Sequence, residues 1–441
     1  MTTWTKRRLA SVILTASIIA AGVPGCGDDE GDDTSDAGGG DSGKGGSGGK
    51  GGTGGKGGTG GKSGAGGSGD DGGAADDAID SKAANLRVNL NLLLSEHLIL
   101  AAKATGAALD GRNDELAAYG ALLNTNGTDL GKLVNAAFGA EAETKFNGIW
   151  SAHNGYFVDY TTGVATDDEA KKTKAVDDLT KKYVPEFADF ISGATGLPKT
   201  TVTELTMAHV VQTKAIVDAQ AEEKWTEAYA AIREAFGHMA MIGDPLSKAI
   251  AAKQPAKFPG VTDTKAVDFR VALNQLLQEH LYLATFATGA ALGERTAELE
   301  AAGAALDKNG TDIGAAIRGL YDAAAETKFN GIWSAHNGFF VDYTTGVAGS
   351  DDAKKAKAVK DLTETYVPMF ADFLSSATGL PKADVAKLTT DHVLTTKAVV
   401  DQQGAEDEVK AAAADRLAGQ HMQMIGDPLS AAIVESKPAK F

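Results

Sequence analysis

Apolar residues recur every three to four positions through residues 84–258, and again through 267–441. This is the spacing of helices that bury one face, and the two-residue alternation of strands is absent. Ala, Leu, Lys and Glu dominate both segments, and the pattern is interrupted at Gly, Asn and Pro. It predicts an all-α fold, with helices in the first segment near 84–109, 113–124, 128–138, 141–163, 168–192, 199–221 and 223–252. Alternatively, the second and third join into one helix, bent at the Asn-Gly-Thr-Asp sequence that ends at Asp129.

The two segments are copies of each other. Residue 84 aligns with residue 267, no gap is needed thereafter, and about 109 of 175 aligned pairs are identical. Each copy is long enough to form its own core. The chain is therefore predicted to hold two tandem helical-bundle domains of about six helices each, at 81–258 and 267–441. A short linker at 259–266 joins them.

The most similar stretch of the two copies is 142–165 and its counterpart 325–348. They differ only at Tyr156, which becomes Phe339. This stretch carries His153 in the first copy and His336 in the second, amid large apolar side chains. Because identity is concentrated here, the segment is constrained more tightly than the rest of the domain, and His153 is its residue least explained by packing alone.

The N-terminal 26 residues have the pattern of an export signal. Lys6, Arg7 and Arg8 precede an apolar run at 9–23, which is too short to span a bilayer comfortably. The sequence Val-Pro-Gly-Cys then ends at Cys26 and resembles the lipobox of bacterial lipoproteins. The resemblance implies a signal peptide at 1–25 and a lipid-anchored protein of the bacterial cell envelope, at the outer membrane or cell surface. The alternative is ordinary secretory cleavage nearby, which would leave Cys26 as a free thiol.

Residues 26–80 are rich in Gly, Ser and acidic side chains, and almost nothing in them can be buried. We expect a disordered tether there. Cys26 is the only cysteine, so the domains contain no disulfides and no thiolate metal site. The net charge of −17 argues against a nucleic-acid binder, because phosphate backbones repel acidic surfaces.

The first predicted helix of each copy is apolar around most of its circumference, which is typical of a central helix. Glu96 and His97 lie in the middle of it, as do Glu279 and His280 in the second copy. A charged residue in such a run is usually paired, protonated or bound to a metal. The alternative places Glu96 on a solvated edge of the helix.

All eight histidines of the chain fall at equivalent positions of the two copies. Each copy draws four of them from four different predicted helices, amid apolar residues. Inward histidines on separate helices are how bundles build metal or haem sites, and imidazole suits Cu, Zn, Fe and Ni. The alternative is that they are hydrogen-bonded core residues. The candidate ligands are His97, His153, His209 and His238, with His280, His336, His392 and His421.

Other side chains are candidate further ligands or partners of the ligands. His238 and Met241 are three residues apart on one helix, and the pair recurs as His421 and Met424. A thioether beside an imidazole favours copper, although methionines also fill gaps in cores. The carboxylate candidates are Glu96, Glu279, Asp159 and Asp342. Asp129 is expected to cap a helix or form a turn, and Asp244 to lie at a helix break.

The copies resemble a family of secreted bacterial helical domains often labelled copper amine oxidase-like. The resemblance rests on LLLSEHLILAA, KFNGIWSAHNGYFVDYT, MAHVVQTKAIVDA and AFGHMAMIGDPLS, and it covers nearly the whole of each copy. It implies the helical fold and a copper ion. Amine oxidase activity is not carried over, because such oxidases resemble large β-rich enzymes. The Glu-x-x-His motif of ferritin-like di-iron sites is absent.

These patterns favour an envelope-anchored lipoprotein whose two domains each bind a transition metal, copper preferred, or a non-covalent haem. The use would be storage, buffering or electron transfer. One alternative is a scaffold or adhesion module with an envelope protein as partner, and another is a metal-dependent oxidoreductase with Glu96 as proton carrier. No phosphate-binding loop, dinucleotide fingerprint or nucleophile elbow was found.

Overall fold

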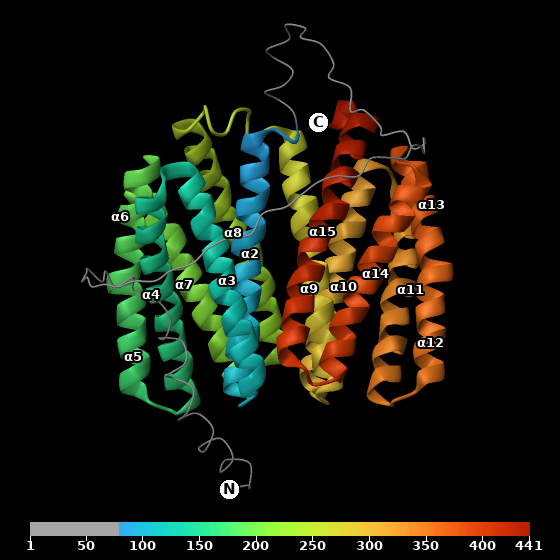
Figure 1. Ribbon diagram of the computed structural model, residues 1–441, viewed down its shortest axis with the longest axis horizontal. Helices are drawn as coiled ribbons and strands as arrows, with labels where there is room; N and C mark the ends of the chain where they lie inside the picture. The colour runs from blue at the N-terminus through green and yellow to red at the C-terminus, as the bar shows by residue number, and fades with distance from the viewer. Residues whose placement is uncertain (1–78) are drawn as a thin grey trace, which may run out of the picture.

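A computed structural model of the chain describes residues 79–441 (Figure 1). The predicted signal peptide, the lipidation of Cys26 and nearly all of the predicted tether lie outside the described residues. Within these, every regular element is a helix, and the second half repeats the element order of the first. The predicted all-α class with two similar helical units is therefore confirmed.

Each repeat consists of six helical rods, one of which is interrupted by a π-helical turn. The first repeat contains α2 (Lys82–Leu109), α3 (Asn113–Phe138), α4 (Ala140–Ala165), α5 (Glu169–Asp178), the π turn η2 (Leu179–Tyr183), α6 (Val184–Thr195), α7 (Lys199–Ala221) and α8 (Trp225–Lys253). The second contains α9 (Lys265–Leu292), α10 (Thr296–Leu320), α11 (Ala323–Ala348), α12 (Asp352–Lys360), η3 (Asp361–Tyr366), α13 (Val367–Thr378), α14 (Lys382–Gly404), α15 (Glu408–Ser436) and the 3₁₀ turn η4 (Pro438–Lys440).

The Asn-Gly-Thr-Asp sequence lies inside one continuous helix, α3, so the joined alternative is correct. Its glycine has a packing role: a Cβ on Gly127 would lie 2.9 Å from Cδ1 of Trp150 in α4. The expectation that Asp129 forms a turn or cap is wrong. Its carboxylate instead accepts a hydrogen bond from Arg416 in the other repeat, at 2.7 Å.

Asp244 was expected at a helix break, and this too is wrong. Helix α8 continues through it, although Pro245 lies within the helix. The Asp244 carboxylate accepts two hydrogen bonds from Arg87 and one from Asn91, all at 2.7 Å. These contacts tie α8 to α2 next to the proline.

The π turns occur where a proline follows in the same rod. Pro185 has no N–H group to continue the ladder, and the N–H of Val184 bonds to the carbonyl of Leu179, five residues earlier. The same slip precedes Pro368, where the N–H of Val367 bonds to the carbonyl of Leu362. Each π turn ends on a buried tyrosine, Tyr183 or Tyr366.

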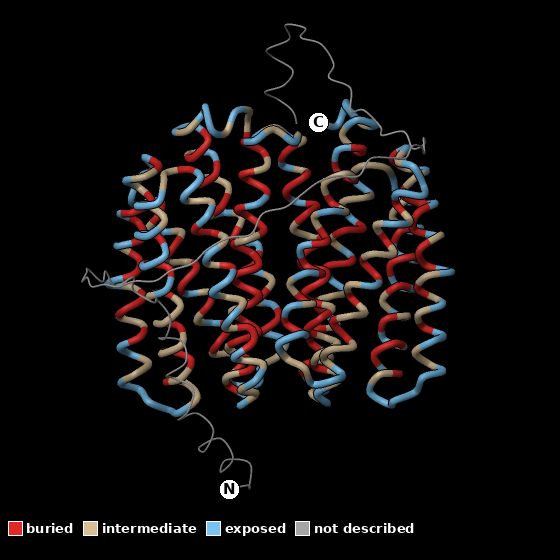
Figure 2. The backbone as a smooth tube through the Cα atoms, in the orientation of Figure 1, coloured by how far each residue is buried: buried red, intermediate tan, exposed pale blue. Residues whose placement is uncertain are grey.

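Helices α2 and α9 lie near the centre of the molecule, and the other helices of each repeat surround them (Figures 1 and 2). Helix α2 is apolar and long enough to span a membrane, but 78% of its most apolar window is buried inside the bundle. It is therefore a core helix here, as its all-round apolar sequence predicted.

Two reciprocal arginine bridges join the repeats. Arg416 in α15 donates to Glu96 and Asp129 of the first repeat, at 3.0 and 2.7 Å. The equivalent Arg233 in α8 donates to Glu279 and Asp312 of the second repeat, at 3.0 and 2.9 Å. The repeats thus face each other with an approximate two-fold relation, and each supplies the cation that neutralises the other's buried glutamate.

One contact between the repeats breaks this symmetry. Lys103 in α2 donates to Asp415 in α15 at 2.6 Å, and both side chains are buried. Tyr119 also donates to Asp415, at 3.0 Å. The positions equivalent to Lys103 and Asp415 in the opposite copies are Phe286 and Ile232, so this buried ion pair exists on one side of the interface only.

Replacing Asp415 alone should strongly destabilise the protein, because Lys103 would remain buried without its counter-charge. We expect D415L to lower the free energy of unfolding by about 3–5 kcal/mol, measured by urea denaturation. The double variant K103M/D415L should recover most of that loss, since an apolar pair can replace a buried ion pair. Equal stability of D415L and the unsubstituted protein would contradict the role given to the pair.

Candidate metal centre

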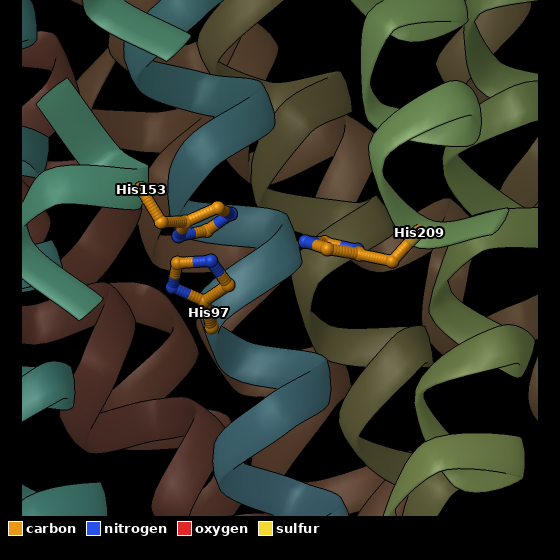
Figure 3. Close-up of side chains that lie close together, drawn as sticks. All are labelled: His97, His153 and His209. Carbon is orange, nitrogen blue, oxygen red and sulfur yellow. The ribbon is translucent and has the colours of Figure 1, made fainter. Parts of the chain in front are cut away.

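Three of the four candidate histidines of the first repeat converge. His97 from α2, His153 from α4 and His209 from α7 each direct one imidazole nitrogen into a group whose members lie within 4.8 Å of one another (Figure 3). The second repeat forms the same group from α9, α11 and α14, with His280, His336 and His392. We call these groups the first and second triad.

The three imidazole nitrogens of a triad could bind one metal ion if they moved slightly closer together. Three atoms no more than 4.8 Å apart all lie within about 2.8 Å of some common point. Metal–imidazole bonds are about 2.0–2.1 Å long, so each nitrogen would move inward by less than about 1 Å. Side-chain rotation over such a distance requires no change in the helices.

The triad is enclosed by aromatic rings. Trp150 stands 4.6 Å from His97, and Tyr183 stands 4.5 Å from His153, measured between ring centroids. The second repeat has the same arrangement, with Trp333 at 4.4 Å from His280 and Tyr366 at 4.5 Å from His336. His153 is only 1% exposed. These rings pack around the imidazoles and shield them from water.

Several imidazole nitrogens are buried and have no hydrogen-bond partner among the described residues. In the first triad these are Nδ1 of His97 and both ring nitrogens of His153. In the second they are Nδ1 of His280 and Nε2 of both His336 and His392. A buried polar atom without a partner costs about 1–3 kcal/mol, and these nitrogens are available to bind a metal ion.

Burial keeps these imidazoles neutral. It lowers the pKa of His97 to about 3, with a further contribution from His209. Burial likewise lowers the pKa of His209 and of His336 to about 4 each. Neutral imidazole is the form that binds metals. Among the described residues, no carboxylate oxygen joins either triad.

The fourth histidine of each repeat is not part of the triad. Nε2 of His238 lies 3.0 Å from the carbonyl oxygen of Leu205, and Nε2 of His421 lies 3.2 Å from that of Leu388. A carbonyl only accepts hydrogen bonds, so both histidines carry their proton on Nε2. His238 and His421 lie instead in the seams between α7 and α8 and between α14 and α15.

The remaining sequence candidates lie away from the triads. Met241 and Met424 are 60% and 59% exposed, so they are surface residues and not triad ligands. Asp159 pairs with Lys171 at 3.3 Å and Asp342 with Lys354 at 3.5 Å, with half-exposed carboxylates. These carboxylates lie on the outer side of their helices, because they follow His153 and His336 by six residues.

Glu96 and Glu279 are buried beside the triads without joining them. Glu96 accepts hydrogen bonds from Asn126 at 2.8 Å and from Arg416 at 3.0 Å. Glu279 makes the equivalent bonds with Asn309 and Arg233. The alternative of a solvated edge is therefore wrong for Glu96, which is 1% exposed and paired with the other repeat.

The two π-turn tyrosines were missed as members of the site. Tyr183 and Tyr366 occupy it because a slipped helical ladder changes which face they present. A sequence signal was available, since Leu-Thr-x-x-Tyr-Val-Pro recurs in both copies with its proline inside a helical pattern. Burial raises the pKa of both phenols, which are neutral at physiological pH.

Comparison with known proteins gave no relative: no family model, no curated protein and no solved structure matches the chain.

Acidification should destabilise the metal-free protein. The triad histidines have a lowered pKa in the folded state, so the unfolded chain, with histidine pKa near 6.5, binds more protons below that pH. Their contribution is complete above about pH 6.5 and is lost as the pH falls toward 4. Each histidine can contribute about 1.4 kcal/mol per pH unit at most.

Urea denaturation between pH 7 and 4.5 measures this slope. The variant H153F/H336F, which removes one titrating imidazole from each triad, should show a shallower dependence on pH. An equal slope in the variant would mean that these histidines do not titrate as their burial requires.

Proposed function

We propose that each repeat binds one transition metal ion, copper preferred, through its histidine triad, and that the protein stores, buffers or passes on this metal. The observation that carries the proposal is the pair of buried, neutral triads in which several ring nitrogens lack partners among the described residues. Unpaired polar atoms at the same place in both repeats are costly, and a bound ion would satisfy them.

Charge favours monovalent copper over a divalent ion. The triads supply three neutral donors each, and among the described residues no carboxylate joins them. A buried dication without a counter-charge loses much more solvation energy than a monocation does. Imidazole suits copper, so Cu(I) is the ion that best combines the donor set with the burial. Met241 does not contribute to this preference at the triad, because its side chain is exposed.

Haem, the other cofactor considered from the sequence, fits less well. Two imidazoles bound to one haem iron lie on opposite faces of a wide planar ring. Here the His97 and His153 rings are 5.4 Å apart and tilted by 40°, with Trp150 and Tyr183 packed against them. A porphyrin would have to displace these walls from a close-packed interior.

The proposed location follows from the sequence. A lipid on Cys26 would anchor the protein to the bacterial cell envelope, and the Gly-rich segment after it would tether the two domains. A metal-binding body at the envelope would meet metal ions as they cross that compartment. A scaffold whose histidines only pack remains the alternative function, and it requires no metal.

The purified protein should bind two ions of Cu(I) per chain, one for each triad. H153A and H336A should each remove one ion, and the double variant both, as measured by elemental analysis after dialysis. Cu(I) at about 100 times its Kd should raise the free energy of unfolding by about 2.7 kcal/mol per site. D159N/D342N changes surface carboxylates on the same helices and should bind normally, as the matched control.

Unchanged copper content in the double histidine variant would place the metal elsewhere. A protein that gains neither metal nor stability from Cu(I), Zn²⁺, Fe²⁺ or haem would favour the scaffold function.

A further inference from the structure

His238 lies in the seam between α7 and α8, beside the turn of α7 that precedes His209. Its Nε2 donates to the carbonyl of Leu205, which lies one turn before His209 on α7. Farther along the same seam, Gln212 donates to Glu234 at 3.2 Å. The two helices are therefore antiparallel along this seam. His209 lies between the bond from His238 to Leu205 and the bond from Gln212 to Glu234.

His238 and His209 are close enough to interact electrostatically. Burial lowers the pKa of His209, and His238 lowers it further. In the second repeat, burial lowers the pKa of His392, followed by His336 and His421. Because the proton of His238 is held on Nε2 by the Leu205 carbonyl, the lone pair of Nδ1 is left for a metal ion. The second repeat repeats the bond through His421 and Leu388.

An exposed methionine stands next to this histidine in both repeats. Met241 follows His238 by three residues, the spacing at which helical side chains are neighbours. Met241 and Met424 are 60% and 59% exposed, whereas Met239 and Met422 on the same helices are 1% and 2% exposed. Core packing explains the buried pair, but it gives no reason for a methionine at the exposed positions of both copies.

We propose that Cu(I) reaches each triad through the seam, by way of Met241, His238 and His209 in the first repeat and Met424, His421 and His392 in the second. This inference rests on the proposed metal-binding function and names its loading route. The thioether of Met241 captures the ion at the surface, since soft sulfur ligands select Cu(I). Nδ1 of His238 then takes it over and passes it to the triad through His209.

The transfer is an exchange of ligands and involves no redox step. At each stage a bond from copper to the next donor forms as the bond to the previous donor breaks, and copper remains Cu(I). A thioether and the unprotonated nitrogen of an imidazole bind the ion without losing a proton, so no proton has to leave during the exchange. The imidazoles of His97 and His153 complete the site once the ion is at His209.

The rate of copper loading tests the route. We would use the purified full-length protein carrying H336A, which disables the second triad, and follow transfer of Cu(I) from a coloured chelator by stopped-flow absorbance. M241L and H238Q should each slow loading by about tenfold. The affinity at equilibrium should remain within about twofold, because neither residue belongs to the triad. Glutamine at 238 keeps an N–H donor for the Leu205 carbonyl.

The second repeat supplies the matched control. In the same H336A background, M424L and H421Q alter the equivalent seam beside the disabled triad and should leave the loading rate unchanged. Loading that is equally fast in M241L and H238Q would overturn the route while leaving the metal site intact. A parallel loss of affinity in H238Q would make His238 a ligand and overturn its role as a relay. Absence of Cu(I) binding in the background protein would overturn the metal site itself.

Discussion

The structure depends on two neighbouring residues of the central helix, Glu96 and His97. Adjacent side chains point about 100° apart around a helix, so these two residues of α2 contact different parts of the molecule. His97 enters the triad of its own repeat, and Glu96 pairs with Arg416 of the other repeat. Glu279 and His280 do the same on α9. Each buried glutamate takes its counter-charge from the opposite repeat, so the central helix connects the triad to the interface between the repeats.

The triads lower the stability of the fold, yet both repeats contain one. Each holds neutral imidazoles away from water, and several of their ring nitrogens have no partner among the described residues. An apolar residue at His153 would remove that cost, and the surrounding rings would pack as well against it. Both copies instead keep the histidine and nearly every residue around it. Packing alone does not explain this choice, whereas binding of an ion explains it directly.

Periodicity was enough to predict the fold and to bring the histidines inward, because each helix must bury its apolar face. It did not predict which histidines meet. His238 is as buried as the triad members, yet its helix turns it into the seam against Leu205. Periodicity also did not predict the partner of Glu96. Arg416 lies in the other copy and reaches Glu96 only because the two repeats pack together. Tyr183 was missed because its position depends on a slip in the helical ladder, which a regular period does not describe.

One difference between the copies concerns how the repeats recognise each other. In an interface between identical repeats, every substitution would appear twice, once on each side. Here Lys103 meets Asp415 on one side, and their counterparts on the other side are the apolar Phe286 and Ile232. If two first repeats paired, Lys103 would face Ile232. If two second repeats paired, Asp415 would face Phe286. Each wrong pairing would bury an uncompensated charge, which costs several kcal/mol. The ion pair therefore directs the first repeat to the second within one chain, and the two triads, free of this asymmetry, keep the same set of ligands.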